Sequence, residues 1–416
     1  MKIVADLHLH SSYSRATSRD MNLDGISKGA KAKGLNLLGT GDFTFKHWLE
    51  ELRRLEPIEG TGLFRYNNVY WMLTSEVNTT YELDNKSRKV HHIIHAPSFD
   101  VVEQINEQLS KFGNLLSDGR PTLDMTPPEL VEIVMNISKY AFIVPAHLWT
   151  SWFGALGEYS GFNSLEECYQ DQLKHIYAFE TGMSSSPAMN WRLSMLDKFT
   201  PISNSDSHSP WTHRLGREAN VFELEKLSYW EIIDAIKNKD RKKFLFTIET
   251  PPEYGKYHWD GHRNCKVFLE PKEAIKYGNI CPVCGKKLTI GVLHRIEELA
   301  DRPEGFVPEN AIPFKTLIPL SELIAAVYNV EVFSRKVWEE STKLIKEFGS
   351  ELNILLEVPE EKLRLLINEK IVDLILKNRE GKVKVQPGYD GEYGFPILDE
   401  NSLKKSMKIQ KSLRDF

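Results

Sequence analysis

Residues 1–11, MKIVADLHLHS, contain a short apolar run that ends in two histidines. The run at residues 3–6 has the composition of a buried strand. His8 and His10 are two positions apart, which places both side chains on the same face of an extended chain. Two neutral imidazoles in this arrangement can chelate one divalent ion. The segment therefore predicts a strand that carries a metal-binding pair at its carboxyl end.

Further apolar runs in the first half of the chain end in the same way, in a side chain that can bind metal. They lead to Asp42 (after 35–40), Glu76 (after 69–74), His95 (after 93–94), His147 (after 141–145), Glu180 (after 176–179) and Asp206 (after 201–203). Helix-length segments such as 24–33, 101–112 and 128–138 separate most of them, although the gap between Glu76 and His91 is polar and irregular. The alternation predicts a parallel sheet closed into an α/β barrel of TIM type, with the reactive residues at one end.

The strand ends offer enough donors for two metal ions. Asp206 and His208 form a second pair two positions apart, in the segment SDSH at 205–208. A carboxylate such as Glu76 could bridge two ions. Paired divalent ions, whether Zn, Mg or Mn, suit phosphoester hydrolysis, because they activate water and stabilise charge on the phosphate oxygens. A structural role explains one histidine at a strand end but not so regular a set.

Length and composition bound the organisation of the protein. A chain of 416 residues predicts two or three domains. We expect the barrel in residues 1–243, a zinc-binding module in 244–300 and a mainly helical domain in 301–416. A net charge of −5 argues against coating nucleic acid by bulk charge. The absence of a long apolar stretch or a signal-like start predicts a cytoplasmic protein that does not contact membranes.

The cysteines predict one structural zinc site. The segment CPVCGK supplies Cys281 and Cys284, and Cys265 lies within the same short region. His262 fits the paired spacing as the fourth ligand, while His258 and His294 are alternatives. Four protein ligands leave no open position for catalysis.

The barrel motifs resemble those of the PHP phosphoesterase family. The resemblance rests on DLHLHS at 6–11, Glu76 after its strand, IIHAP at 93–97, PAH at 145–147 and SDSH at 205–208. It implies a distorted seven-stranded barrel that holds two or three metals. One would be held by His8, His10, Glu76 and Asp206, and a second by Glu76, His95 and His147.

The chain departs from that family at the third metal site. Where a TDH motif is usual, Gly41-Asp42-Phe43 stands here, and Arg15 and Ala16 stand where a further histidine is often found. Asp42 and His208 remain candidates for a third ion with water. Glu180 is expected to act as the base or as a partner of the ligands. His91 lies at the start of its strand and is not expected to bind metal.

Three features favour nucleic acid as the substrate. The chain carries a zinc module and a helical domain, aromatic residues crowd the loops after His147, and basic runs occur at 237–243 and 404–414. The segments at 179–193, 281–302 and 386–394 resemble the endonuclease Q family of DNA-repair enzymes. That resemblance implies cleavage on the 5′ side of hypoxanthine, uracil, xanthine and abasic sites in double- or single-stranded DNA, leaving a 3′-hydroxyl and a 5′-phosphate. Replication or repair factors are further expected partners.

Recognition of a deaminated base requires hydrogen-bond donors, because deamination replaces an exocyclic amine by a carbonyl. Main-chain amides, Ser184, Ser185, Ser186 and Asn190 are the expected donors, and Trp152 and Tyr159 are the expected stacking residues. Two other functions remain open at this point. One is a phosphatase of small monoesters, and the other is a non-catalytic DNA-binding scaffold.

Overall fold

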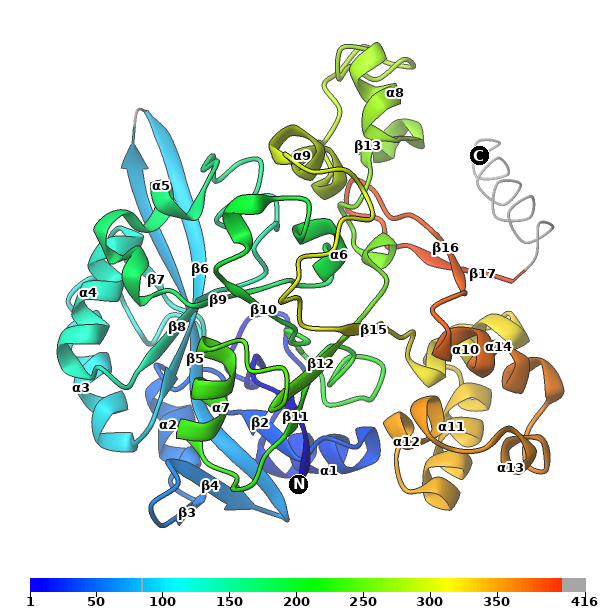
Figure 1. Cartoon of the computed structure of the whole chain (residues 1–416), viewed down its shortest axis with the longest axis horizontal. Coiled ribbons are helices and arrows are strands. Elements are labelled where there is room, and N and C mark those ends of the chain that lie inside the picture. Colours follow the sequence, from blue (N-terminus) through cyan, green and yellow to red (C-terminus); the bar gives the residue numbers. More distant parts are fainter. Residues whose placement is uncertain (84, 399–416) are drawn as a thin grey trace.

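All seven predicted barrel strands are present in the computed structural model, which describes residues 1–83 and 85–398 (Figure 1). The strands are β1 (Lys2–Asp6), β2 (Leu37–Gly39), β5 (Val69–Leu83), β6 (Lys86–Ala96), β8 (Phe142–Pro145), β9 (Ala178–Glu180) and β10 (Thr200–Ile202). Each apolar run becomes a buried strand because both of its faces are covered, one by the barrel interior and the other by helices.

Main-chain pairing closes these strands into a distorted barrel. β1 is parallel to β2 and β2 to β5, β6 is antiparallel to both β5 and β8, and β9 is parallel to β10. Two loop hydrogen bonds complete the circle. The Leu148 amide donates to the Glu180 carbonyl at 2.9 Å, and the His10 amide donates to the Ser207 carbonyl at 3.0 Å. The expected α/β barrel is confirmed.

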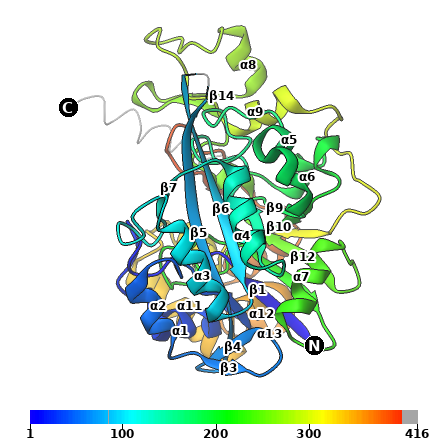
Figure 2. The ribbon, with the colours of Figure 1, turned by 90° about the vertical axis from the view of Figure 1, so that its left-hand side faces the viewer.

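The connection between β5 and β6 differs from the other crossovers. The two strands form a long antiparallel hairpin, paired from Leu73 with Ala96 to Leu83 with Lys86. The polar segment after Glu76 is therefore extended strand and not a helix. Figures 1 and 2 show the blue hairpin rising from the barrel on the same end as the zinc module. Because β6 runs against its neighbours, its first residues lie at the end of the barrel where the other strands finish.

Further strands extend the sheet at both edges. β11 (Ala219–Glu223) pairs with β1, β12 (Phe244–Glu249) pairs with β11, and β15 (Phe314–Thr316) pairs with β12. The boundary expected at residue 243 is thus too early, because the sheet takes in β12 and β15. On the other side, β3 (Glu56–Ile58) and β4 (Leu63–Tyr66) form a hairpin beside β5, and β7 (Thr122–Asp124) pairs with the upper half of β5.

Amphipathic helices cover the outside of the barrel. They are α1 (Leu23–Lys33), α2 (Lys46–Leu52), α3 (Phe99–Leu109), α4 (Pro127–Ile137), α5 (Leu165–Tyr169), α6 (Pro187–Asn190) and α7 (Tyr229–Lys237). Asn22, Ser98 and Thr126 cap the three helices predicted at 24–33, 101–112 and 128–138, since each side chain accepts a hydrogen bond from an amide of the first turn. These caps fix where the helices begin.

The zinc module and the helical region follow the barrel. The module contains β13 (Asp260–His262), β14 (Val267–Leu269), α8 (Pro271–Lys276) and α9 (Val292–Leu299). The helical region contains α10 (Leu320–Tyr328), α11 (Arg335–Phe348), α12 (Glu351–Leu356), α13 (Glu360–Arg364) and α14 (Glu369–Arg379), which enclose a core of their own. Within the described residues, no helix has the length and apolar character that crossing a bilayer requires.

The three parts are joined by shared packing. Val292 and Ile296 of α9 and Leu352 of α12 belong to the same apolar cluster as the barrel helices. The buried Lys33 ammonium of α1 lies 2.7 Å from a carboxylate oxygen of Glu351 in α12. The hairpin of β16 (Lys384–Gln386) and β17 (Phe395–Ile397) then brings the chain back to the zinc module, where Tyr389 bridges to Trp259 (Figure 1). The predicted basic run at 404–414 lies outside the described residues.

Candidate metal centre

The first ligand group consists of His8, His10, Glu76 and Asp206, whose donor atoms all lie within 4.8 Å of one another. His10 Nε2 is 3.1 Å from Glu76 Oε2 and 3.0 Å from Asp206 Oδ1. His8 Nε2 is 3.5 Å from the same Glu76 oxygen. The histidines come from the end of β1, Glu76 from the middle of β5 and Asp206 from the loop after β10.

The donor atoms of this group fit a divalent cation. His8 Nε2, His10 Nε2 and Asp206 Oδ1 are buried and have no hydrogen-bond partner among the described residues. Asp206 Oδ1 nevertheless lies 3.0 Å from His10 Nε2 and 3.7 Å from His8 Nε2. Buried polar atoms are nearly always hydrogen-bonded, so atoms that converge without bonding each other are typical of ligands around a shared ion. Two imidazoles and two carboxylates suit Zn or Mn.

The second ligand group consists of Glu76, His91 and His147. Glu76 Oε1 is 2.6 Å from His91 Nδ1 and 3.0 Å from His147 Nε2. The other oxygen of the same carboxylate, Oε2, faces His8 and His10. Glu76 therefore stands between the two groups, as its predicted bridging role requires.

His91, and not His95, belongs to the second group. In the hairpin register Glu76 is opposite Ile93, so that His91 and His95 flank it on the same face. His95 Nδ1 lies 3.1 Å from the carbonyl oxygen of Phe142, and His95 is in neither group. The expectation assumed that β6 is parallel to its neighbours, in which case its end would lie at the metal centre. Because β6 is antiparallel, its beginning lies there and its end lies deeper in the barrel.

Glu180 and Asp42 hold the imidazoles and do not join the ligand groups. Both Glu180 oxygens lie 3.1 Å from His8 Nδ1, and they also accept from the His147 amide at 2.8 Å and from Asn204 at 2.9 Å. Glu180 is fully buried, and its contacts hold the ring of His8, while its expected role as the base stays a prediction.

Both carboxylate oxygens of Asp42 are also engaged in hydrogen bonds. The expected third ion is therefore left without its main ligand. Oδ1 of Asp42 lies 3.0 Å from His10 Nδ1, and Oδ2 accepts hydrogen bonds from Ser11 and Ser14. His208 directs Nδ1 to the main-chain carbonyl of Asp206 at 2.9 Å and packs against the His10 ring. Among the described residues, neither Asp42 nor His208 is part of a ligand group.

Electrostatics keep the carboxylates charged. Burial raises the pKa of Glu76, but Arg120, His8 and the hydrogen bond from His10 outweigh it and hold that pKa well below its usual value. Burial lowers the pKa of His8, yet Glu180 and Glu76 raise it well above normal. Burial lowers the pKa of His91 to about 4, so this imidazole is neutral and able to bind a metal.

Arg120 was not predicted from the sequence. Its Nη1 lies 3.1 Å from Glu76 Oε2, and the charge of Glu76 raises the pKa of the guanidinium. It stands in the loop before β7, where no strand-end pattern marks it. In the sequence, only its position after Gly119 at the end of a polar segment could have suggested a functional role for Arg120.

Of the expected stacking residues, Trp152 and Tyr159 are exposed and lie together. Their rings stack with centroids 4.9 Å apart, and Tyr257 meets Trp152 edge-on at 5.0 Å. The neighbouring Phe153 stacks on the ring of His91 at 4.5 Å. We call Trp152, Tyr159 and Tyr257 the aromatic cluster. Its loop thus contacts the second ligand group directly.

The expected base-contacting donors Ser185 and Asn190 are buried and already bonded. Ser185 Oγ donates to the Thr181 carbonyl at 2.9 Å, and Asn190 donates to Ser185 Oγ at 3.0 Å. Asn190 Oδ1 accepts from the Trp149 indole at 2.7 Å. They hold the loop after β9 and are closed to a DNA base. Ser184 is partly exposed and packs beside Gly255.

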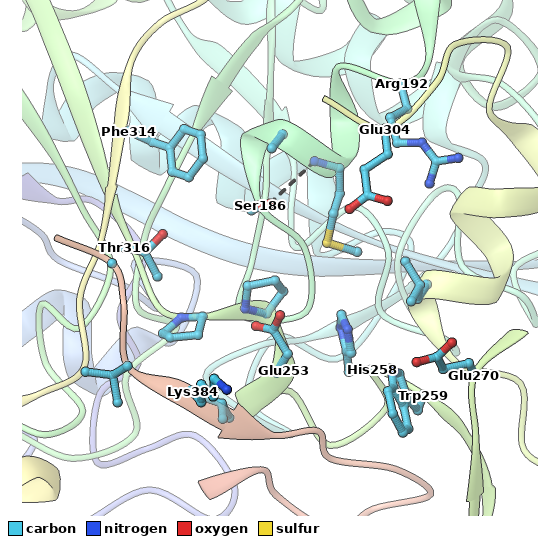
Figure 3. A pocket seen from close by; sticks show the side chains of 18 of the residues that line it. Ser186, Arg192, Glu253, His258, Trp259, Glu270, Glu304, Phe314, Thr316 and Lys384 are labelled. Carbon is cyan, nitrogen blue, oxygen red and sulfur yellow. Dashed lines mark hydrogen bonds between the residues drawn. The ribbon is translucent and has the colours of Figure 1, made fainter. Parts of the chain in front are cut away.

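A cavity of about 780 Å³ lies beyond this loop, between the barrel, the zinc module and the β16–β17 hairpin (Figure 3). Ser186, Arg192, His258 and Trp259 line it, together with the carboxylates of Glu253, Glu270 and Glu304. None of its lining residues belongs to a ligand group. The carboxylates make it a poor site for phosphate.

The zinc module brings together the predicted ligands His262, Cys265, Cys281 and Cys284. His262 Nδ1 lies 3.6 Å from Cys284 Sγ. The alternative His294 is bound to Asp260 and is not in the cluster. The three sulfurs and one imidazole match a tetrahedral structural zinc site.

Comparison with known proteins gives matches to parts of the chain and to almost all of it. A family model described as the MJ0043 C-terminal domain matches residues 319–382. MJ0043, an uncharacterized protein of Methanocaldococcus jannaschii, is 33% identical over 254 residues, which cover 59% of this chain and 30% of that protein. The chain therefore spans less than a third of the length of that relative.

Two solved structures agree with this chain over almost its whole length. The lesion-specific endonuclease PfuEndoQ of Pyrococcus furiosus is 34% identical with a TM-score of 0.86, and the match covers 97% of each chain. Endonuclease Q in complex with a 27-mer duplex that has an abasic lesion at the active site matches with the same identity and TM-score, over 97% of this chain and 98% of that one. Fold and sequence agree along the barrel, the zinc module and the helical region alike, and the chain accordingly belongs to the endonuclease Q family.

Proposed function

We propose that this protein is a metal-dependent DNA-repair endonuclease that hydrolyses the phosphodiester on the 5′ side of deaminated bases and abasic sites. The products would be a 3′-hydroxyl and a 5′-phosphate. The observation that carries the proposal is the pair of ligand groups that share Glu76 at the open end of the barrel. Its likeness to an endonuclease that binds a lesion-containing duplex supports DNA as the substrate.

The chain supplies the means to hold two divalent ions and to fix their ligands. His8, His10, Glu76 and Asp206 would hold one ion, and Glu76, His91 and His147 the other. Bound there, the ions supply an activated water and neutralise charge on the phosphate oxygens. Glu180 fixes the ring of His8, and Asp42 fixes that of His10, so that Nε2 of each imidazole faces the group.

The exposed aromatic cluster supports contact with an opened duplex. Trp152 and Tyr159 are exposed aromatic rings that stack on each other, and bases stack on aromatic rings without regard to sequence. A base that lacks a normal partner leaves the helix at the least cost. Ser185 and Asn190 are engaged elsewhere, so we assign the reading of the lesion carbonyl to main-chain amides and to partly exposed groups such as Ser184.

Matched labelled duplexes test this function. They carry one hypoxanthine, uracil, xanthine or abasic site, or no lesion, and the cut is mapped to the nucleotide. Incision 5′ of each lesion with an intact undamaged duplex is the expected result. Hydrolysis of p-nitrophenyl phosphate without DNA cleavage would identify a phosphatase instead, and binding without any cleavage would identify a scaffold.

A further inference from the structure

A small cavity lies beside the second ligand group and shares His91 with it. Its volume is about 230 Å³, and its wall includes Arg15, Asn78, His91, Asp118, Arg120 and Phe153. His91 and Phe153 form the side toward the metal centre, where their rings stack. Two arginines form the other side. We call this cavity the arginine pocket.

Arg120 reaches from the pocket to the metal centre. One guanidinium nitrogen lies 3.1 Å from Glu76 Oε2, the oxygen that also faces His8 and His10. Within the described residues, Glu76 is the one side chain to which this guanidinium donates. The Arg120 side chain is 27% exposed, so its other donors remain open to the pocket. A planar guanidinium can hold one carboxylate and still offer a fork to a phosphate.

Asp118 is the acidic residue of the pocket, and it serves to hold the two arginines. Its Oδ1 accepts from the main-chain amides of Arg15 at 3.4 Å and Arg120 at 3.1 Å. Its Oδ2 lies 3.2 Å from Nε of Arg15. Both oxygens are engaged, so Arg15 is paired with Asp118 and Arg120 with Glu76, while both guanidiniums line the pocket.

Arg15 stands at the position where the PHP pattern often has a further histidine. Asp42, which would serve a third ion, is bonded to His10, Ser11 and Ser14. Gly119 lies so close to Asp42 that an added Cβ would come within 2.3 Å of its Oδ2. The loop that carries Arg120 therefore packs against the residue that a third ion would need. At this edge of the metal centre, positive charge is therefore supplied by the side chains of Arg15 and Arg120 and not by a third ion.

We propose that the arginine pocket binds the DNA backbone, with Arg120 on the phosphate that is cut and Arg15 on a neighbouring phosphate of the same strand. This assignment rests on the proposed endonuclease function. Arg120 touches Glu76, which both ligand groups share, so a phosphate at the centre is within its reach. Its donors would stabilise the charge that grows on the phosphate oxygens during hydrolysis. The Arg15 side chain is 84% exposed, and it contributes to DNA binding but not to the chemical step.

The test compares Arg120→Gln and Arg15→Gln with Arg65→Gln, an exposed arginine of β4 that pairs with Glu56 and lies opposite Tyr70 at the start of β5. The metal-loaded proteins are assayed on an abasic duplex. Arg120→Gln should lower kcat about 10- to 100-fold with little change in KM, as expected for one charge-assisted contact. Arg15→Gln should raise KM and reduce the slope of log affinity against log salt by about one contact. Arg65→Gln should change neither.

Two measurements besides cleavage keep the assignment falsifiable. Barrel metal content must be the same in Arg120→Gln and the wild type, because loss of metal would mean that Arg120 acts only by holding Glu76. A duplex with a methylphosphonate at the cut position should bind the wild type more weakly than the normal duplex, and this loss of affinity should be smaller for Arg120→Gln, in which only the ions remain to meet the charge. Equal weakening in both proteins would overturn the contact.

The outcome also separates this inference from the function on which it rests. If the wild type cuts no lesion duplex, the proposed function fails, and inorganic phosphate then becomes the probe. Binding to the metal-loaded wild type should broaden the ³¹P resonance of phosphate, and Arg120→Gln should not broaden it. Equal broadening by both proteins would show that the pocket is not the anion site.

Discussion

His91 Nδ1 lies 2.6 Å from Glu76 Oε1, although the two residues face each other across a hairpin and not along neighbouring parallel strands. This contact assigns the second ion to His91. His91→Ala should lose the second barrel ion and most of the activity, because it removes a ligand. His95→Ala should retain both ions. Metal content per chain after dialysis provides the measurement. If His95→Ala loses an ion and His91→Ala keeps both, His95 and not His91 is the ligand of the second ion.

The shared carboxylate should matter more than the residues that hold the ligands. Glu76→Ala or Asp206→Ala should lower the rate of cleavage by orders of magnitude, while the protein remains folded. Glu180→Gln keeps an acceptor for His8 but removes the charge, and should reduce metal affinity or activity by about 10- to 100-fold. Titration of activity against added Mn²⁺ separates these effects. Wild-type turnover in Glu76→Ala with unchanged metal content would contradict the centre.

The zinc module should act through stability. Cys284→Ser removes one ligand of the cluster and should release one zinc, because binding of structural zinc supplies folding free energy. The melting temperature of the module should fall, and affinity for DNA should fall with it. His294→Ala is the matched control, since that histidine is bonded to Asp260 and should leave the zinc content unchanged.

The aromatic cluster should affect all lesions to the same degree. Trp152→Ala removes a stacking face worth about 1–3 kcal/mol per base, and should weaken binding of hypoxanthine, uracil and abasic duplexes together. Tyr140→Ala offers a control, because Tyr140 is exposed but packs against Trp230 on α7. A Trp152→Ala protein whose loss is confined to one lesion would assign Trp152 to reading the base edge.

A buried carboxyl pair predicts the direction of pH-dependent stability. Glu249 and Glu218 are fully buried, and burial raises the pKa of both, to about 8 for Glu249. The charge of Glu249 raises the pKa of Glu218 further, and the charge of Glu180 raises that of Glu249. A raised carboxyl pKa favours the folded state at low pH, and that contribution is lost as pH rises through the folded-state value. Glu249→Gln keeps an acceptor for Thr181 and should make stability less dependent on pH. Parallel denaturant titrations at pH 6 and above pH 8 measure the difference.

The sequence was sufficient for the strands whose polar residues follow an apolar run. His8, His147 and Asp206 were found because each follows the end of a buried strand, whereas Glu76 follows an apolar run but lies inside the longer strand β5. The same reasoning misplaced the ligand on β6, since direction along a strand is set by its partners and not by its own residues. Ser185 and Asn190 have polar side chains, but only their contacts reveal that the hydrogen bonds are spent within the loop.

Arg120 could not be found in this way, because it lies in a loop whose path depends on long-range contacts. Asp118 binds the amides of Arg15 and Arg120, which are remote from each other in the chain. Such a contact leaves no periodic trace in the sequence. The zinc ligands are the opposite case, since short spacing and a turn glycine confine them locally.

The ion pair of Lys33 with Glu351 and the apolar cluster that includes Val292 and Leu352 limit how this protein can be taken apart or recombined. A gene fragment cut after the barrel strands would encode a nuclease whose outer helix faces water with an apolar patch. An exchange of the helical region with that of a distant relative would need the matching acid opposite Lys33. The barrel, the zinc module and the helical region are therefore a single packing unit, and truncation between them should yield insoluble protein rather than a smaller folded one.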